Sequence, residues 1–242
     1  MNKFIRTTLH NKIDIKHGFA FLGKYFISSG EYIVLTPGNF YEEGGFKLQI
    51  GKEKFYNHSF PKEYLHQKGD LIVAMTEQGA GLLGSAAIVP LDNRYLHNQR
   101  LGLITMNENK MDKVFMYYLL NTKYIRRQIS LSSTGTKVKH TSPKRIYDVV
   151  ALLPDITVQQ KIAKVLSTLD AKIELNNRIN KELEAMAKTL YDYWFVQFDF
   201  PHVNGKPYKS SGGKMVYNEE LKREVPEGWE VKRISDLLNV VT

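Results

Sequence analysis

The stretch that decides the fold is VQQKIAKVLSTLDAKIELNNRINKELEAMAKTLYDYWFVQ, residues 158–197. No Pro or Gly occurs between Pro154 and Pro201. Thr157 is the expected N-cap, because its hydroxyl can accept a hydrogen bond from a free backbone N–H. At about 1.5 Å per residue the helix would be roughly 60 Å long, which is too long for the core of a chain of 242 residues.

Apolar residues recur along this helix at alternating spacings of four and three. The series contains Ile162, Leu166, Leu169, Ile173, Leu183, Ala187, Leu190 and Trp194, with Asn176 and Asn180 at the two places where it should continue. This is the pattern of a coiled-coil seam with a polar break that can fix helix register. It predicts a spacer helix that needs a partner helix. The alternative is a long amphipathic helix packed on its own domain.

The positive charge is concentrated before this helix. The net charge is +9, and residues 1–156 hold 21 Lys and Arg against 13 Asp and Glu, a net of +8. Because Lys and Arg release counterions from phosphates, nucleic acid is the leading partner for this part. The alternative is an ordinary basic surface.

Composition excludes several classes of protein. The chain has no Cys, so disulfides and thiolate metal sites are excluded. The N-terminal residues lack the apolar core of a signal peptide, and no apolar run approaches about 18 residues, so we expect no membrane span and a cytoplasmic location.

Residues 1–156 are expected to form one mixed α/β domain. The predicted strands cover 31–35, 47–50, 71–75, 85–89, 101–105 and 146–153, with a helix from Asp112 to Ile129. Residues 157–200 are the spacer helix. Residues 201–242 are expected to be a linker and the truncated start of a second domain, because 203–214 (VNGKPYKSSGGK) is typical of a flexible linker. The fold class is therefore α/β (α+β), a mixed domain followed by a coiled-coil-forming helix.

The sequence offers no catalytic constellation. Gly79, Gly81 and Gly84 match a dinucleotide fingerprint, but an apolar run and Pro90 follow where a helix is required, so a glycine-rich hairpin is predicted. The histidines lack metal-ligand spacing, and the acidic residues are scattered. We therefore expect a protein that is not an enzyme and has no metal or cofactor of its own.

Three loops combine basic groups with aromatic, amide or hydroxyl side chains: 16–24, 36–47 continuing into 52–62, and 134–144. Phosphates favour Lys, Arg and hydroxyls, whereas base edges favour Asn, Gln, Arg or Lys. The candidate DNA-binding residues are Lys16, Asn39, Tyr41, Lys47, Lys54, Gln78, Lys137, Lys139 and Lys144. For each of them the alternative is an ordinary solvated loop residue. Asn98-Gln99-Arg100 abuts a strand, which favours structural hydrogen bonds.

Several motifs resemble those of type I restriction-modification specificity subunits. They are Leu153-Pro154, Gln159-Gln160, Ile162-Ala163, Leu169-Asp170-x-Lys172-Ile173-Glu174-x-Asn176, Trp194-Phe195-Val196, Phe198-Asp199-Phe200 and Pro226-x-Gly228-Trp229. The loop 133–139, Gly69-Asp70 and Asn98-Gln99-Arg100 extend the match. The resemblance covers nearly the whole chain and is weakest in the recognition loops.

The resemblance implies a non-catalytic DNA-recognition subunit. Family members carry two recognition domains, held apart by antiparallel helices, that read the two halves of a bipartite double-stranded DNA target. Modification (methyltransferase) subunits, which use S-adenosylmethionine, dock on this scaffold, and restriction subunits add ATP-driven, Mg-dependent cleavage. This chain holds one recognition domain, one helix and the opening of a second domain, so it is expected to be either a fragment of a longer chain or a natural half-subunit. For a half-subunit the hypothesis is a homodimer through antiparallel helices. Two alternatives are a truncated or regulatory DNA-binding protein that competes with a full-length subunit, and a module of another restriction system.

Overall fold

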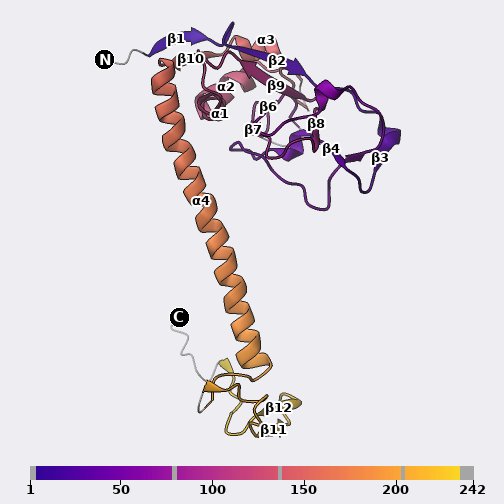
Figure 1. Cartoon of the computed structure of the whole chain (residues 1–242), viewed down its shortest axis with the longest axis vertical. Coiled ribbons are helices and arrows are strands. Elements are labelled where there is room, and N and C mark those ends of the chain that lie inside the picture. Colours follow the sequence, from indigo (N-terminus) through magenta and orange to yellow (C-terminus); the bar gives the residue numbers. More distant parts are fainter. Residues whose placement is uncertain (1–3, 78–80, 136–137, 203–204, 235–242) are drawn as a thin grey trace. The chain divides into compact units, whose positions relative to one another are not determined.

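The computed structural model describes residues 4–77, 81–135, 138–202 and 205–234 (Figure 1). Its backbone divides into two compact units, Met1–Thr168 and Leu169–Thr242. The division falls inside helix α4 (Ile156–Tyr191), so the first turns of this helix belong to the first unit and its remainder belongs to the second.

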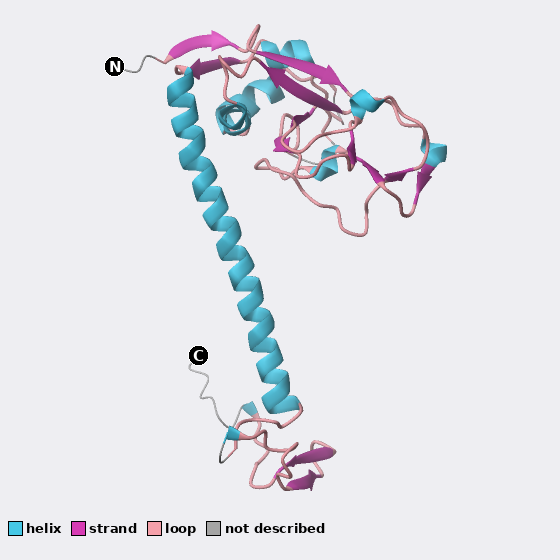
Figure 2. Ribbon diagram, viewed as in Figure 1, coloured by secondary structure: helices cyan, strands magenta, loops and turns pink. Residues whose placement is uncertain are grey.

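A four-stranded antiparallel sheet forms the centre of the first unit (Figure 2). In spatial order its strands are β2 (Ile13–His17), β9 (Leu101–Met106), β6 (Leu71–Ala74) and β7 (Ala86–Ile88). Side chains alternate between the two faces of a strand. Leu71 and Val73 join the apolar cluster of helices α1 (Lys113–Leu120) and α2 (Lys123–Leu131), while Ile72 and Ala74 join a second cluster around Phe40. Both faces of β6 are therefore buried.

A second, smaller sheet is rich in aromatic residues. Its order is β3 (Phe26–Ile27), β5 (Phe55–Tyr56), β4 (Tyr32–Val34) and β8 (Tyr95–Leu96). The pair β4 and β8 is parallel, and the other pairs are antiparallel. Tyr56 is 3% exposed and contacts Phe21, Tyr25 and Phe26 edge to face, so aromatic packing holds these short strands together.

A two-stranded ladder joins the beginning of the first unit to its end. β1 (Ile5–Thr8) pairs antiparallel with β10 (Val150–Leu153), and Ile5 lies opposite Leu153. The short helix α3 (Pro143–Tyr147) precedes β10, with the Ser142 side chain capping its N-terminus. Three 3₁₀ turns complete the unit: Gly23–Tyr25, Pro37–Asn39 and Lys62–Tyr64.

Helix α4 begins earlier than its sequence signals predict. The Asp155 carboxylate accepts from Val158 N at 3.0 Å, so Asp155 is the N-cap and the prediction of Thr157 was wrong. The first turns are fixed to the core of the first unit, since Gln159 is 2% exposed and Ala163 is 5% exposed. A π-helical turn, Asp192–Val196, follows α4, and Gln197 N donates to Asp192 O at 2.8 Å.

The second unit gathers aromatic side chains after the helix. Phe200 stacks on Tyr208 (ring centroids 4.8 Å apart) and on Trp229 (5.5 Å), and Phe198 meets Trp229 edge to face. A hairpin of β11 (Met215–Asn218) and β12 (Arg223–Pro226) lies between these segments in sequence. The described part of the predicted linker, 205–214, forms defined contacts: Asp199 accepts from Ser210 N at 2.7 Å and from its hydroxyl at 2.6 Å.

The predicted fold class, mixed α/β with a long helix, is confirmed. Other expectations were wrong in detail. The helix expected from Asp112 to Ile129 is divided at Asn121 and Thr122, because the Thr122 hydroxyl caps a new helix. Residues 47–50 form no strand, and the strand expected over 146–153 begins only at Val150. Strands β1, β2, β3, β5, β8, β11 and β12 were missed.

Candidate nucleic-acid interface

Three loops meet at one end of the central sheet: the connection between β6 and β7, the loop between α2 and α3, and residues 36–47. Glu77 N donates to Lys139 O, and Thr141 N donates to Met75 O, both at 2.9 Å. Thr76 Oγ1 lies 3.2 Å from His140 Nδ1. The loop between α2 and α3 is therefore attached along the β6–β7 connection, which is the antiparallel hairpin that the glycine spacing predicted.

Arg126 of α2 fastens the third loop, residues 36–47, to the same connection. Its Nε donates to Leu83 O at 2.9 Å, its Nη1 to Glu42 O at 3.0 Å, and its Nη2 to Gly81 O. Burial lowers the pKa of Arg126, while Glu42, Glu77 and Glu43 oppose that change. Because a guanidinium stays protonated in proteins, this side chain is a fixed positive clamp beneath the loops.

Four lysines in these loops or in neighbouring segments are exposed or partly exposed and could contact phosphates. Lys47 is exposed, and its Nζ lies 5.7 Å from the ring centroid of Tyr41, which is 50% exposed. Lys144 on α3 and Lys54 beside β5 are exposed, and Lys139 is partly exposed. None of these four lysines makes an ion pair with another residue of the described part.

The candidates Asn39 and Lys16 are occupied within the fold. Asn39 is 6% exposed, its Oδ1 accepts from Thr36 N at 2.9 Å, and its Nδ2 donates to Lys47 O at 3.2 Å. It caps a turn and cannot reach a base edge in this conformation. Thr36 three positions earlier completes a capping box. Lys16 Nζ lies 3.3 Å from Glu63 and 4.4 Å from the centroid of the Tyr64 ring.

Two candidates, Gln78 and Lys137, lie outside the described residues. Asn98 accepts from Arg100 N at 3.0 Å, which agrees with the structural role expected for this segment. Arg126 is the residue that sequence reasoning missed, because its partners are carbonyls of loops more than 40 positions away.

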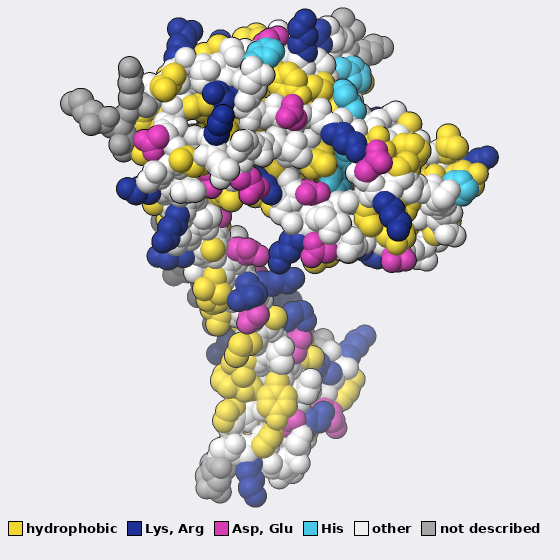
Figure 3. Space-filling view, turned by 45° about the horizontal axis from the view of Figure 1, so that its top comes forward, with side chains coloured by type: hydrophobic (Ala, Val, Ile, Leu, Met, Phe, Trp, Pro, Cys, Tyr) yellow, Lys and Arg dark blue, Asp and Glu magenta, His cyan; other side chains and the backbone are white. Residues whose placement is uncertain are grey.

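Figure 3 shows Lys and Arg scattered among acidic and apolar side chains on the visible face of the first unit. Charge alone therefore does not outline the interface.

A second surface lies on α4. Leu169, Ile173, Leu183 and Leu190 are 46–57% exposed, and Asn176 and Asn180 are also exposed. Leu166 is partly exposed, whereas Ile162 packs against the core of the first unit and is not free for a partner. An apolar groove of about 600 Å³ is lined by Leu183, Ala185, Met186, Ala187, Thr189, Leu190 and Tyr193.

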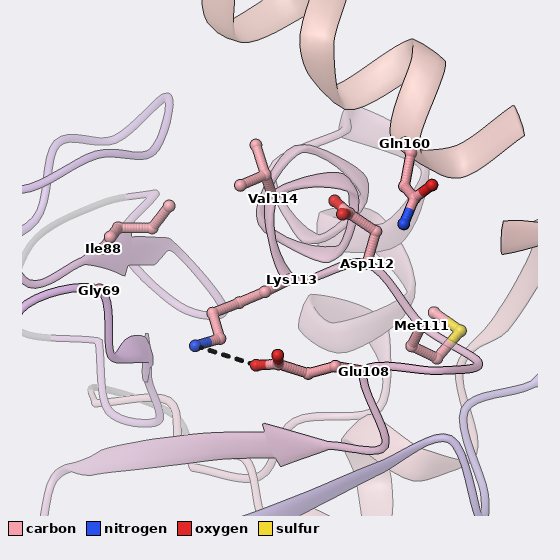
Figure 4. Close-up of a pocket in the computed structure, with 8 residues that line it drawn as sticks. All are labelled: Gly69, Ile88, Glu108, Met111, Asp112, Lys113, Val114 and Gln160. Atoms are coloured by element: carbon pink, nitrogen blue, oxygen red, sulfur yellow. Dashed lines mark ion pairs between the residues drawn. The ribbon is translucent and has the colours of Figure 1, made fainter. Parts of the chain in front are cut away.

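A mixed pocket of about 390 Å³ lies where α1 meets the first turns of α4 (Figure 4). Lys113 and Glu108 form an ion pair of 3.3 Å across it, beside Asp112 and Gln160.

In the part of the chain that the structure describes, no three acidic or His side chains are grouped to hold a metal ion. None of the described helices combines the length and the apolar character that a membrane span requires.

The sequence matches relatives across its length. It is 36% identical over 126 residues to the type I restriction enzyme MjaIX specificity subunit of Methanocaldococcus jannaschii (52% of this chain, 27% of that protein). It is 34% identical over 163 residues to the HindI specificity subunit of Haemophilus influenzae (64% and 33%), and 23% identical over 241 residues to the EcoBI specificity subunit of Escherichia coli (98% and 47%). The chain therefore spans less than half the length of these relatives.

Solved structures share the fold. The S subunit of a type I restriction-modification system from M. genitalium superposes with a TM-score of 0.57 at 16% identity, over 82% of this chain and 47% of that chain. The HsdS subunit from Thermoanaerobacter tengcongensis gives a TM-score of 0.50 at 16% identity, over 77% and 42%. The sequence model of the type I restriction modification DNA specificity domain matches residues 9–185. The chain therefore belongs to the family of type I restriction-modification DNA specificity domains.

Proposed function

We propose that the first unit reads one half of a bipartite DNA target and that α4 is both the spacer to the other half and a docking surface for modification and restriction subunits. The family is defined by DNA specificity, so the chain has a recognition role and not a catalytic one. In this proposal S-adenosylmethionine, ATP and Mg bind only the partner subunits.

The observation that carries the DNA-reading part is the meeting of two loops, residues 36–47 and the loop between α2 and α3, at the β6–β7 connection. Tyr41, Lys47 and Lys139 come from loops far apart in sequence, and the Arg126 clamp and the Glu77–Lys139 backbone bond fix those loops. A preorganised loop loses less conformational entropy on binding than a free one. Lysines without ion partners are ready to contact phosphates, and such contacts position a protein on the duplex.

The arrangement of the seam favours pairing with a second copy. The two Asn residues lie at the centre of the seam. In an antiparallel dimer whose two-fold axis passes between Asn176 and Asn180, apolar seam residues lie opposite apolar ones and Asn lies opposite Asn. Leu169 then lies opposite the partner's Ala187, and Ile173 lies opposite the partner's Leu183. The same register sets Asn176 against Asn180 of the partner, so two polar residues meet instead of being buried against apolar ones.

This register can be tested directly because the chain has no Cys. In the proposed dimer Ile179 lies within about one helical turn of its own copy, whereas Leu169 lies about 27 Å from its copy at 1.5 Å per residue. Ile179→Cys should therefore cross-link to a dimer with a short bis-maleimide, and Leu169→Cys should not. Cross-linking of both variants would indicate parallel helices, and a monomer in light scattering would refute the homodimer.

Target reading is tested separately by sequencing the methylome of a host that carries the chain with its modification and restriction subunits. The proposal requires a methylated motif that disappears when the chain is deleted. Stable co-purification with a modification subunit distinguishes this role from that of a free DNA-binding competitor. An unchanged methylome after deletion would refute the proposal.

A further inference from the structure

The loop 47–52 (KLQIGK) presents two aliphatic side chains to solvent. Ile50 is 84% exposed, the highest fraction among the large apolar side chains of the described part, and Leu48 is 59% exposed. Single exposed aliphatic residues are common on protein surfaces. Two of them at alternate positions of one loop, with no apolar cover, form a protruding apolar edge.

This edge is held rigidly. Lys52 N donates to Gln49 O at 2.9 Å, and Gly51 has φ +76°, which is the positive φ that a type II turn requires at its third position. Ile50 therefore occupies the apex of a β-turn. Gln49 Nε2 donates to Gly38 O at 3.0 Å and pins the base of the loop. Since the backbone is already fixed, inserting the apex into a partner costs little conformational entropy.

The charge around the apex selects the partner. Lys47, Lys52 and Lys54 flank it, against one acidic residue, Glu53, and these three lysines make no ion pair with another described residue. Lys47 also contacts Tyr41 of the candidate interface. An apolar tip surrounded by cations complements a duplex, in which stacked bases lie between rows of phosphates.

We propose that Ile50, supported by Leu48, inserts between neighbouring base pairs of the DNA target while the flanking lysines hold the phosphates. The inference rests on the proposed DNA recognition. Apolar side chains inserted between base steps partly unstack them and kink the duplex. Because the cost of that distortion depends on the step, Ile50 would add sequence preference without a hydrogen bond to a base.

The test uses the full chain and duplexes that the wild type selects from a random-sequence pool, with 2-aminopurine placed at each position in turn. Binding of the wild type should raise the 2-aminopurine fluorescence at one step, which reports unstacking. Ile50→Ala should abolish that rise and weaken binding to the selected duplex about tenfold, the order expected for losing the burial of one aliphatic side chain. Binding to unselected duplex should change by less than about twofold, since phosphate contacts remain.

Two further variants separate insertion from other effects. Leu91→Ala removes a 52% exposed aliphatic side chain from the turn between β7 and β8 and should behave as wild type. Ile50→Lys adds a cation and removes the wedge, so it should bind unselected DNA at least as tightly as wild type and give no fluorescence rise.

The possible failures are distinguishable. If the wild type binds no duplex, the proposed DNA recognition itself is refuted. If it binds and Ile50→Ala retains both affinity and fluorescence, the insertion is refuted while recognition stands. Loss of co-purification with the modification subunit, with DNA binding unchanged, would show that the apex contacts protein and would also overturn the inference.

Discussion

Replacing Arg126 with Ala should lower the free energy of unfolding of the first unit by about 3 kcal/mol. A hydrogen bond from a charged donor contributes about 1.5–3 kcal/mol. The bonds to Leu83 O and Gly81 O are partly buried, whereas the bond to Glu42 O is exposed and can be replaced by water. At about 1.5 kcal/mol for each of the two partly buried bonds, and with no contribution from the exposed bond, the expected loss is about 3 kcal/mol.

The neighbouring Arg127 provides a matched control. Its side chain is exposed and makes no hydrogen bond or ion pair with another residue of the described part, so Arg127→Ala should change stability by less than about 0.5 kcal/mol. Arg126→Lys should give an intermediate loss, because a single ammonium group cannot reproduce the planar fork of the guanidinium.

Urea unfolding followed by circular dichroism measures these differences, and fluorescence anisotropy with a duplex measures DNA binding. Arg126→Ala should also weaken DNA binding under conditions where it remains folded, because the β6–β7 connection loses the bonds to Leu83 O and Gly81 O and the loop 36–47 loses one of its attachments to that connection. Equal stability of the Arg126→Ala and Arg127→Ala proteins, within about 0.5 kcal/mol, would refute the assignment of Arg126 as a clamp.

The remaining predictions concern charge, attachment of the helix and pH. Lys139→Ala should weaken binding to all duplexes alike and reduce the slope of log affinity against log salt by about one unit, as measured by salt titration. Gln159→Ala should lower the free energy of unfolding by about 2 kcal/mol, because its buried amide accepts from Asp112 N at 3.0 Å and donates to Pro154 O at 2.9 Å; urea unfolding checks this. Burial lowers the pKa of His97 from 6.5 to about 4. The neutral His97 side chain therefore makes its full contribution to the free energy of unfolding above pH 6.5, and this contribution is lost as the pH falls towards 4. Between pH 7 and pH 5 the free energy of unfolding should therefore fall less in His97→Gln than in the wild type, which unfolding measured at the two pH values checks.

Local patterns predicted the long helix and the buried strands β4, β6, β7, β9 and β10, but not the shorter or more exposed strands. The heptad spacing, free of Pro and Gly, identified α4 because helix periodicity is a local property. The predicted N-cap was wrong because Asp155 and Thr157 are both suitable N-cap residues. The path of the chain after β10 determines which of the two side chains lies next to a free backbone N–H. The run KLQI at 47–50 alternates like a strand, but Gly51 turns the chain and both apolar side chains point to solvent.

The candidate interface could be predicted only in part. Loop composition selected Tyr41, Lys47 and Lys139, because exposed cations and aromatic residues are visible in sequence. Whether an amide is free depends on tertiary contacts: Asn39 is consumed by a bond to the carbonyl of Lys47, eight positions away. No local pattern distinguishes Arg126 from Arg127, since the helix register relative to the sheet determines which of them is buried.

The ladder between β1 and β10 has a consequence for how new specificities arise. Ile5 and Leu153 are neighbours across this ladder, so the chain enters and leaves the first unit at one place. The candidate interface is built from the segment enclosed between these two strands, and both junctions are short pieces of regular backbone pairing. Exchange of the enclosed segment for another with the same flanking strands would leave the entry to α4 unchanged. Under the proposed function, the architecture therefore favours the acquisition of a new target by recombination of the whole enclosed segment, with the spacing between half-sites inherited from the helix.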